Sequence, residues 1–229
     1  MEKPTIFQLI ENYSGSEDLI DHIKNNIYDL YFYYDSFNVF TYSALFVNGS
    51  LQLLVDFCIK NLSNCIDLES LDNRGNNALH TSCIEGYVSN VKYLLEAGFN
   101  PDKLNRHSQT PMILAIESQS LLVINILGLL VHYDADVNLL TPINMAIFMK
   151  NKEIIKYLLR RNVCVSDNLK KLILYIDPDF ITYMIKRKKK NEDEDEYEFT
   201  KKFYKYSTKF GYPTTKFFYS KILLHKLNS

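Results

Sequence analysis

The residues that could do chemistry are few in this chain of 229 residues, and they are scattered along it. No histidine stands with an acid and a nucleophile in a recognisable catalytic motif, and no phosphate-binding loop or dinucleotide motif is present. The five histidines are His22, His80, His107, His132 and His225. The four cysteines, which have neither Cys-x-x-Cys spacing nor histidines at metal-ligand spacing, are Cys58, Cys65, Cys83 and Cys164. We therefore predict no enzyme activity, no metal site and no cofactor, and we interpret the cysteines as buried thiols.

Charge gives little support to a nucleic-acid partner. The formal net charge is -1, and the basic run at 186–190 is followed at once by an acidic run at 191–198 that would partly cancel its field. We expect the acidic run to be a linker, because a dense block of charge cannot repay the entropy lost on ordering. Nuclear import through the basic run stays open as an alternative to a cytoplasmic location.

The sequence shows no sign of membrane insertion or secretion. No apolar run approaches the roughly 20 residues that a membrane-spanning helix needs. Residues 1–20 contain an early acidic residue and lack both a long apolar core and a small-residue cleavage site. We therefore expect no membrane partner and a cytoplasmic protein.

A repeat with a period near 33 organises the middle of the chain. Residues 72–102 form one unit, and the pattern starts again at residues 105–119. A unit of this length holds one tight turn and two short helices, which cannot bury their own apolar face and must stack on further copies. The period therefore predicts an all-α solenoid of stacked helix-turn-helix units.

The best-formed unit resembles an ankyrin repeat. It has Asn77 and Ala78 where the family usually has Thr and Pro. The positions that match the family pattern are Asp72, Gly75, Leu79, His80, Gly86, Leu94, Leu95 and Gly98. The resemblance implies a structural role for His80, as a hydrogen-bonding brace at the start of the helix. It also implies a binding protein rather than an enzyme.

The other units follow the same frame with departures. The best-formed unit predicts helices over residues 77–85 and 89–97. In the next unit, Thr110 and Pro111 open the inner helix, and about three extra residues should lengthen or bulge the outer helix at 121–133. Thr141 and Pro142 then open a third inner helix so early that its finger, the turn between units, must be truncated.

The ends of the array are less regular. Residues 41–61 fit the frame when Gly49 is aligned with Gly86, and residues 17–35 are expected to form a helix or a helix pair. A fainter unit is expected at 168–187. The predicted organisation is a helical cap over 1–39, an array of about four units over 40–188, an acidic linker over 189–198, and a helical cap or docking tail over 199–229. Deleting the tail would separate a stabilising cap from a docking segment that folding does not need.

Ankyrin proteins bind partners through the finger tips and the exposed face of the inner helices, so the resemblance implies a candidate surface. Its residues are Leu71, Asn73, Arg74, Asn76, Ile84, Glu85, Leu104, Arg106, His107, Gln109, Glu117, Ser118, Phe148 and Met149. Val47 and Asn48 are weaker upstream equivalents. Phe148 and Met149 are the strongest candidates if they are exposed, because exposed aromatic and methionine side chains tend to anchor partners. The alternative is that the truncated finger makes them ordinary core.

The function predicted on this basis is non-enzymatic binding of another protein through the concave side of the array. The composition and shortened fingers further resemble the ankyrin proteins of poxviruses and other large DNA viruses, which implies a role against host innate immune signalling. The alternative is a substrate receptor that recruits a ubiquitin ligase through its C-terminal segment. That segment lacks the Leu-Pro-x-Glu opening of an F-box-like sequence. Neither reading requires a small-molecule substrate.

Overall fold

The structure is a computed structural model that describes residues 5–15, 17–62, 65–161, 163–166, 169–170, 173 and 176–177. The chain divides into two compact units, residues 1–149 and residues 150–229. Within the described ranges the secondary structure is almost entirely helical. No helix among the described residues is long and apolar enough to cross a membrane.

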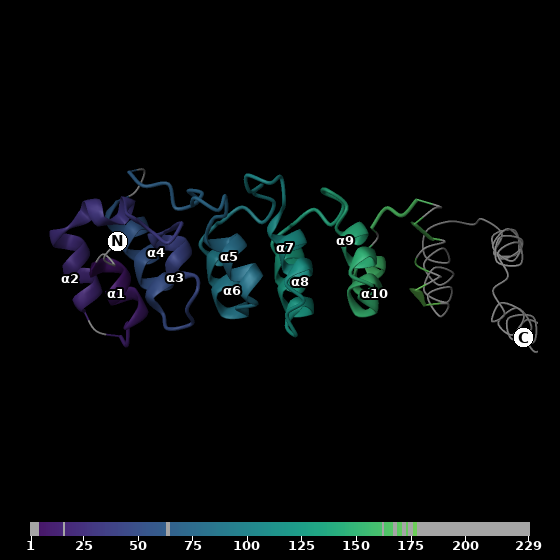
Figure 1. Ribbon diagram of the computed structural model, residues 1–229, viewed down its shortest axis with the longest axis horizontal. Helices are drawn as coiled ribbons and strands as arrows, with labels where there is room; N and C mark the ends of the chain where they lie inside the picture. Colours follow the sequence, from purple (N-terminus) through teal and green to yellow (C-terminus); the bar gives the residue numbers. More distant parts are fainter. Residues whose placement is uncertain are drawn as a thin grey trace, which may run out of the picture. The chain divides into compact units, whose positions relative to one another are not determined.

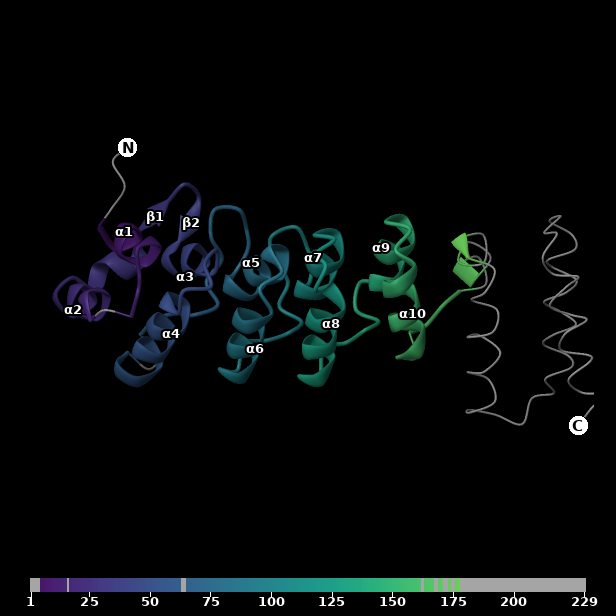
Figure 2. The same ribbon diagram turned by 90° about the horizontal axis from the view of Figure 1, so that it is seen from below.

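The first unit is built from helix pairs that stand side by side in two rows (Figures 1 and 2). The inner row consists of α1 (Thr5–Glu11), α3 (Val39–Ser43), α5 (Ala78–Glu85), α7 (Pro111–Glu117) and α9 (Pro142–Phe148). The outer row consists of α2 (Asp18–Asn25), α4 (Ser50–Asn61), α6 (Val88–Glu96) and α8 (Val123–His132). Each helix contacts the next one in its own row. The expected stacked helix-turn-helix solenoid is therefore confirmed.

Small residues allow the inner helices to pack closely. Cys83, Ala115 and Ala146 are fully buried, one on each of α5, α7 and α9. Leu79 and Met112 fill the space beside them, at 0% and 1% exposure. Because each unit completes the core of its neighbour, the stability of such an array depends on the contacts between adjacent units.

The interpretation of the cysteines as buried thiols holds for two of the four. Cys58 and Cys83 are buried, and burial raises the pKa of the Cys58 thiol to about 12. Cys65 and Cys164 are exposed, so the interpretation is wrong for them. Both follow the end of an outer-type helix, in connecting segments that no periodic apolar pattern marks as interior.

Residues 1–39 contain more than helices. The chain turns through a 3-10 helix, η1 (Ile27–Tyr31), into a small antiparallel hairpin of β1 (Tyr33–Tyr34) and β2 (Phe37–Asn38). Asp35 and Ser36 link the strands with φ values of 47° and 73°, as a type I′ hairpin turn requires. The expected helix at 17–35 is thus corrected at its end, because this turn serves as the first finger.

The unit built from α3 and α4 starts two residues earlier than the alignment of Gly49 with Gly86 predicts. Asn38 and Thr41 form a capping box, in which each side chain accepts a hydrogen bond from the other residue's backbone N–H, at 2.8 Å and 3.0 Å. Asn77 and His80 do the same at the start of α5. Thr41 is therefore the counterpart of His80, and the loop that leads to Gly49 is longer.

The extra residues between α7 and α8 form a loop. Only Gly86 and Tyr87 separate α5 from α6, whereas residues 118–122 separate α7 from α8. Gln119 has a φ of 52°, and Leu121 is fully exposed. Of the two expected results, a bulge before the outer helix is the observed one.

The finger before α9 is truncated as expected. Residues 133–141 separate α8 from α9, whereas residues 97–110 separate α6 from α7. The short connection holds Leu140 and Thr141 at φ values of 55° and 54°. Thr141 consequently makes no side-chain cap, although Thr110 caps α7 by accepting from the Ile113 N–H at 3.3 Å.

The second unit begins with α10 (Lys152–Arg160), which lies within the expected array. Asn151 caps it by accepting from the Ile154 N–H at 3.1 Å. Its buried residues are Ile154, Ile155, Leu158 and Leu159. Most of the fainter unit at 168–187, and all of the linker and tail predicted over 189–229, lie outside the described residues.

Candidate protein-binding face

The second finger, at residues 72–76, and the third finger, at residues 105–109, are each folded around one buried polar side chain. Asp72 is fully buried, and its Oδ1 accepts from the backbone N–H groups of Arg74 and Asn76, both at 2.9 Å. In the next unit Asn105 Oδ1 accepts from the N–H groups of His107 and Gln109, also at 2.9 Å. One side chain thus satisfies two donors that the tight turn would otherwise leave unpaired.

Asn105 holds its finger with one amide oxygen, so we predict that a single side-chain oxygen is also enough at position 72. We expect Asp72→Ala to lower the free energy of unfolding by about 2 kcal/mol, because two backbone N–H groups, one buried and one partly buried, lose their acceptor. Asp72→Asn should cost less than about 1 kcal/mol, since Asn105 holds its finger with an amide. Urea unfolding followed by circular dichroism measures both. Equal losses for the two variants would show that the carboxylate charge itself is required.

His80 braces the second finger against the third. Its Nε2 lies 3.0 Å from the Lys103 carbonyl oxygen and 3.3 Å from that of Gln109, so an N–H on Nε2 can donate to both. Its Nδ1 then accepts from the Asn77 backbone N–H at 3.3 Å. Burial in this site lowers the pKa of His80 to about 4, which keeps the ring neutral near pH 7. The hydrogen bonds of His80 match the structural role that the resemblance implies.

Backbone hydrogen bonds join neighbouring fingers directly. The Asn73 N–H donates to the Ser36 carbonyl at 2.9 Å, and the Arg106 N–H donates to the Gly75 carbonyl at 3.1 Å. A Cβ built on Gly75 would lie 2.7 Å from the Arg106 Cβ. Glycine at this position therefore lets the two fingers touch, and the finger tips form a continuous ridge.

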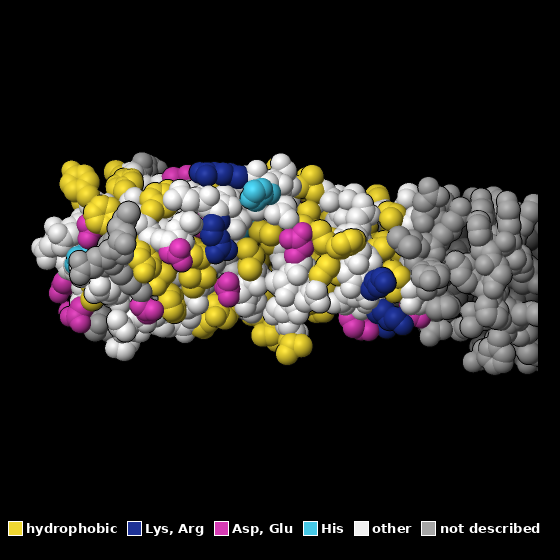
Figure 3. All heavy atoms as spheres, in the orientation of Figure 1, with side chains coloured by type: hydrophobic (Ala, Val, Ile, Leu, Met, Phe, Trp, Pro, Cys, Tyr) yellow, Lys and Arg dark blue, Asp and Glu magenta, His cyan; other side chains and the backbone are white. Residues whose placement is uncertain are grey.

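Most of the finger residues in the candidate set are on the surface. Asn73, Arg74, Arg106 and His107 are exposed, and Leu104 is 43% exposed. Leu71 and Gln109 are half-buried. Figure 3 shows basic and histidine side chains along this finger side of the first unit.

Asn76 is an exception and corrects the candidate set. It is only 6% exposed, and its Oδ1 accepts a hydrogen bond from Asn105 Nδ2 at 2.9 Å. The side chain links the second and third fingers in the interior and does not reach the surface. Asn48, an upstream equivalent, is likewise used internally, because its Nδ2 donates to the Ile10 carbonyl at 2.8 Å. Val47 beside it is 59% exposed.

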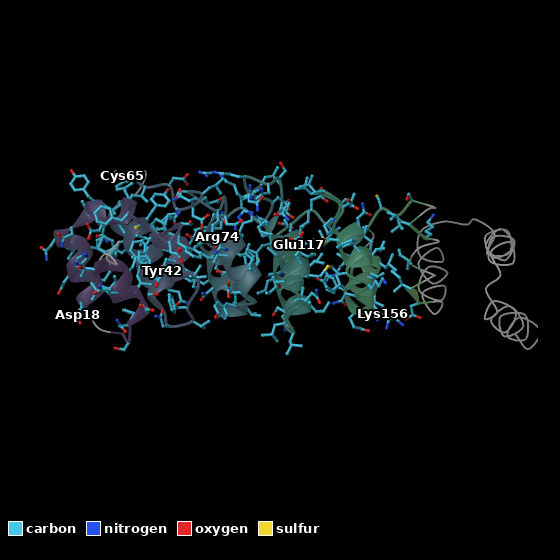
Figure 4. The ribbon with its side chains drawn as sticks, viewed as in Figure 1. Asp18, Tyr42, Cys65, Arg74, Glu117 and Lys156 are labelled. Atoms are coloured by element: carbon cyan, nitrogen blue, oxygen red, sulfur yellow. The ribbon has the colours of Figure 1, made fainter. Side chains whose placement is uncertain are left out.

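The inner helices add an acidic edge to the same face. Glu85 at the end of α5 is exposed, whereas Ile84, Glu117 and Ser118 are half-buried. Gln109 Nε2 donates to both carboxylate oxygens of Glu117, at 3.1 Å and 3.0 Å. Figure 4 labels Arg74 and Glu117 and shows the side chains around them. Finger and helix positions are therefore linked within one unit.

Phe148 is an exposed aromatic residue at the end of α9. It is 79% exposed, although Ala146 and Ile147 just before it are 0% and 5% exposed. Met149 is half-buried. The interpretation that the truncated finger makes Phe148 a core residue is therefore wrong, because the shortened finger does not fold over it.

Two exposed apolar groups were not anticipated from the sequence. Residues 28–33 expose four aromatic side chains, and the bulge before α8 exposes two leucines. These residues are Tyr28, Tyr31, Phe32, Tyr33, Leu121 and Leu122. Tyrosine-rich sequence and the leucine pair both look like buried helix, and only the turn geometry places them outside.

The remaining described histidines do not form a reactive constellation. His22 Nε2 lies 2.7 Å from Asp29 Oδ2, and the His132 ring packs edge-on against Tyr133. Among the residues that the structure describes, no three His, Cys, Asp or Glu side chains are grouped so that they could hold a metal ion.

The fold and its face define a class of protein: a repeat scaffold of stacked helix pairs, which in general is a non-enzymatic interaction module. Residues 41–140 match the family model described as ankyrin repeats, in three copies. Among solved structures, the chain is similar to the ankyrin repeat domain of Bcl-3, which is described as a unique member of the IkappaB protein family. The TM-score is 0.59 at 16% sequence identity, over 71% of this chain and 73% of that chain. At this identity the likeness concerns the fold alone.

Proposed function

We propose that the chain binds another protein through the face formed by its finger tips and inner helices, without catalysis. The observation that carries the proposal is Phe148, an aromatic side chain 79% exposed at the end of α9, directly after the buried Ala146 and Ile147. Exposed aromatic and arginine side chains on a rigid surface are the usual anchors of protein partners. A preformed face also lowers the ordering cost of association.

The narrower role follows from the resemblance to the ankyrin proteins of large DNA viruses. Under that hypothesis the chain acts in the host cytoplasm, and its partner is a component of innate immune signalling. In the adaptor alternative, the repeats hold a substrate while residues 199–229 recruit a ubiquitin ligase. Preys captured only when those residues are present would favour the adaptor.

A pull-down tests the proposed face. Immobilised full-length chain and an Arg74→Ala, Arg106→Ala, Phe148→Ala variant are compared for the proteins they retain from a host cell lysate. We expect at least one prey to be retained about tenfold less by the variant, because loss of hot-spot anchors typically costs more than 1 kcal/mol each.

Leu121→Ser is the matched control, since it removes a fully exposed apolar side chain from outside the candidate set. It should leave the same prey bound. Unfolding curves of all three proteins establish that the array is intact. If no prey distinguishes the triple variant from the control, the face is not the binding site.

A further inference from the structure

The side chain of Arg74 is held in place by an aromatic ring. Its guanidinium carbon lies 4.3 Å from the centroid of Phe37, a residue of the first finger. Phe37 is itself 7% exposed and packs edge-on against Tyr42. A guanidinium stacked on a fixed ring keeps its N–H groups free for hydrogen bonding while losing little further entropy on binding.

The side chain of Arg106 begins from the adjacent position on the ridge. Its backbone N–H bonds to the carbonyl of Gly75, the residue that follows Arg74, and its stem packs over Gly75. Arg74 and Arg106 thus come from neighbouring fingers that touch at Gly75.

Neither guanidinium is neutralised within the described part of the chain. The ion pairs found there use other groups, such as Lys103 with Glu69 at 3.8 Å, and no described acidic side chain pairs with Arg74 or Arg106. Two exposed cations on adjacent fingers favour an anionic ligand that could pair with both. His107, also exposed, lies next to Arg106.

The charges around the arginines favour a short anionic group over a long polyanion. Glu85 and Glu117 line the helix side of the same face, and the formal net charge of the chain is -1. A nucleic-acid backbone, with a charge at every nucleotide, would meet these carboxylates. A peptide can instead place acids at the arginines and apolar or neutral residues elsewhere.

We propose that the partner supplies an extended acidic peptide segment whose carboxylates pair with Arg74 and Arg106. This proposal rests on the proposed function and specifies its partner's chemistry. Residues at i and i+2 of an extended chain point to the same side, about 7 Å apart. Acidic residues at alternate positions therefore suit two arginines on adjacent fingers better than acids at consecutive positions, which point to opposite sides.

Fluorescence anisotropy with labelled twelve-residue peptides tests this. The probes are alternating Glu-Ser, the same length of alternating Gln-Ser, and a peptide with the Glu-Ser composition but its glutamates in one block. We expect the alternating Glu-Ser peptide to bind most tightly, to weaken as salt rises, and to lose at least about tenfold in affinity in Arg74→Glu, Arg106→Glu.

The matched control is Lys60→Glu, Lys92→Glu, which makes the same change of net charge on the outer helices α4 and α6. It should bind like the unaltered chain. Equal affinity for the glutamate and glutamine peptides, an equal loss in both charge-reversed variants, or tighter binding of a twelve-residue oligothymidine than of any peptide would overturn the proposal.

The pull-down distinguishes a failure of this proposal from a failure of the proposed function on which it rests. If a prey is lost with Phe148→Ala but kept with the double variant Arg74→Glu, Arg106→Glu, the face binds a protein but the proposal of an acidic segment is wrong. If neither change affects any prey, the proposed function itself fails.

Discussion

Replacing Gly86 with alanine is expected to be among the most damaging single-methyl changes in the array, lowering the free energy of unfolding by about 3 kcal/mol. Gly86 ends α5 with a φ of 78°, a left-handed conformation that costs other residues about 1–2 kcal/mol. A Cβ at this position would also lie 2.3 Å from Ser120 Oγ and 2.9 Å from Ser120 Cβ, so the neighbouring unit must shift. Urea unfolding of the full chain measures the loss.

Gly98→Ala separates the two causes. Gly98 has a φ of 89°, but no atom lies within 4 Å of the Cβ that alanine would add. Its loss should therefore be about 1 kcal/mol, from the backbone conformation alone. A loss as large for Gly98→Ala as for Gly86→Ala would mean that contact with Ser120 contributes nothing.

A second replacement tests the contact from its other side. Ser120→Gly removes both atoms that the new Cβ would meet, so it should recover part of the stability of Gly86→Ala. Coupling of about 1 kcal/mol or more is expected from a double-mutant cycle, since residues in contact are not additive. Such coupling would show that the turn between α5 and α6 and the bulge before α8 depend on each other for stability.

The stability of the array is expected to fall between pH 6.5 and pH 4 because of His80. Burial lowers the pKa of His80 from an ordinary 6.5 to about 4. In that window the unfolded chain takes up a proton that the folded chain does not, so unfolding becomes easier as the pH falls. The neutral ring contributes fully above pH 6.5, and about 3 kcal/mol is lost by pH 4.

His80→Gln is the variant that tests this, because glutamine does not titrate. It should be less stable at pH 7.5, since it cannot reproduce the bonds to the Lys103 and Gln109 carbonyls. Its unfolding midpoint should then change less between pH 6.5 and pH 4 than that of the unaltered chain. Carboxylates titrate in both proteins, so the difference between the two curves reports His80.

His107→Gln serves as the control, because His107 is exposed on a finger tip. It should reproduce the pH dependence of the unaltered chain. Parallel curves for the unaltered chain and His80→Gln would exclude His80 as the source of the pH dependence.

Much of the fold could be predicted because its signals are local. The capping residue Asn77 and the terminating Gly86 act within one turn of α5, and they place both of its ends within a residue of the prediction. Thr110 and Pro111 mark the start of α7 in the same way. The glycine alignment failed for α3 because loop length varies, whereas the capping box at Asn38 marks the start of that helix directly.

The candidate face was harder to predict, since exposure depends on neighbours that are distant in sequence. Asn76 belongs to a finger tip by position, yet Asn105 of the next unit binds it in the interior. Phe148 was open to either interpretation until the course of the shortened finger was known. The aromatic side chains of residues 28–33 could be placed outside only after the hairpin at Asp35 and Ser36 was seen.

By itself the sequence determined the repeating helix pairs and their caps, because hydrogen bonds within a few residues enforce them. The bracing role of His80 was implied by the resemblance, and its bonds to Lys103 and Gln109 came from the tertiary structure. Only the tertiary structure decided that Arg74 lies on Phe37, that Arg106 packs over the adjacent Gly75, and that neither arginine has an acidic partner in the described residues. Those relations join residues about 30 to 40 positions apart, and they arise when one unit stacks on the next.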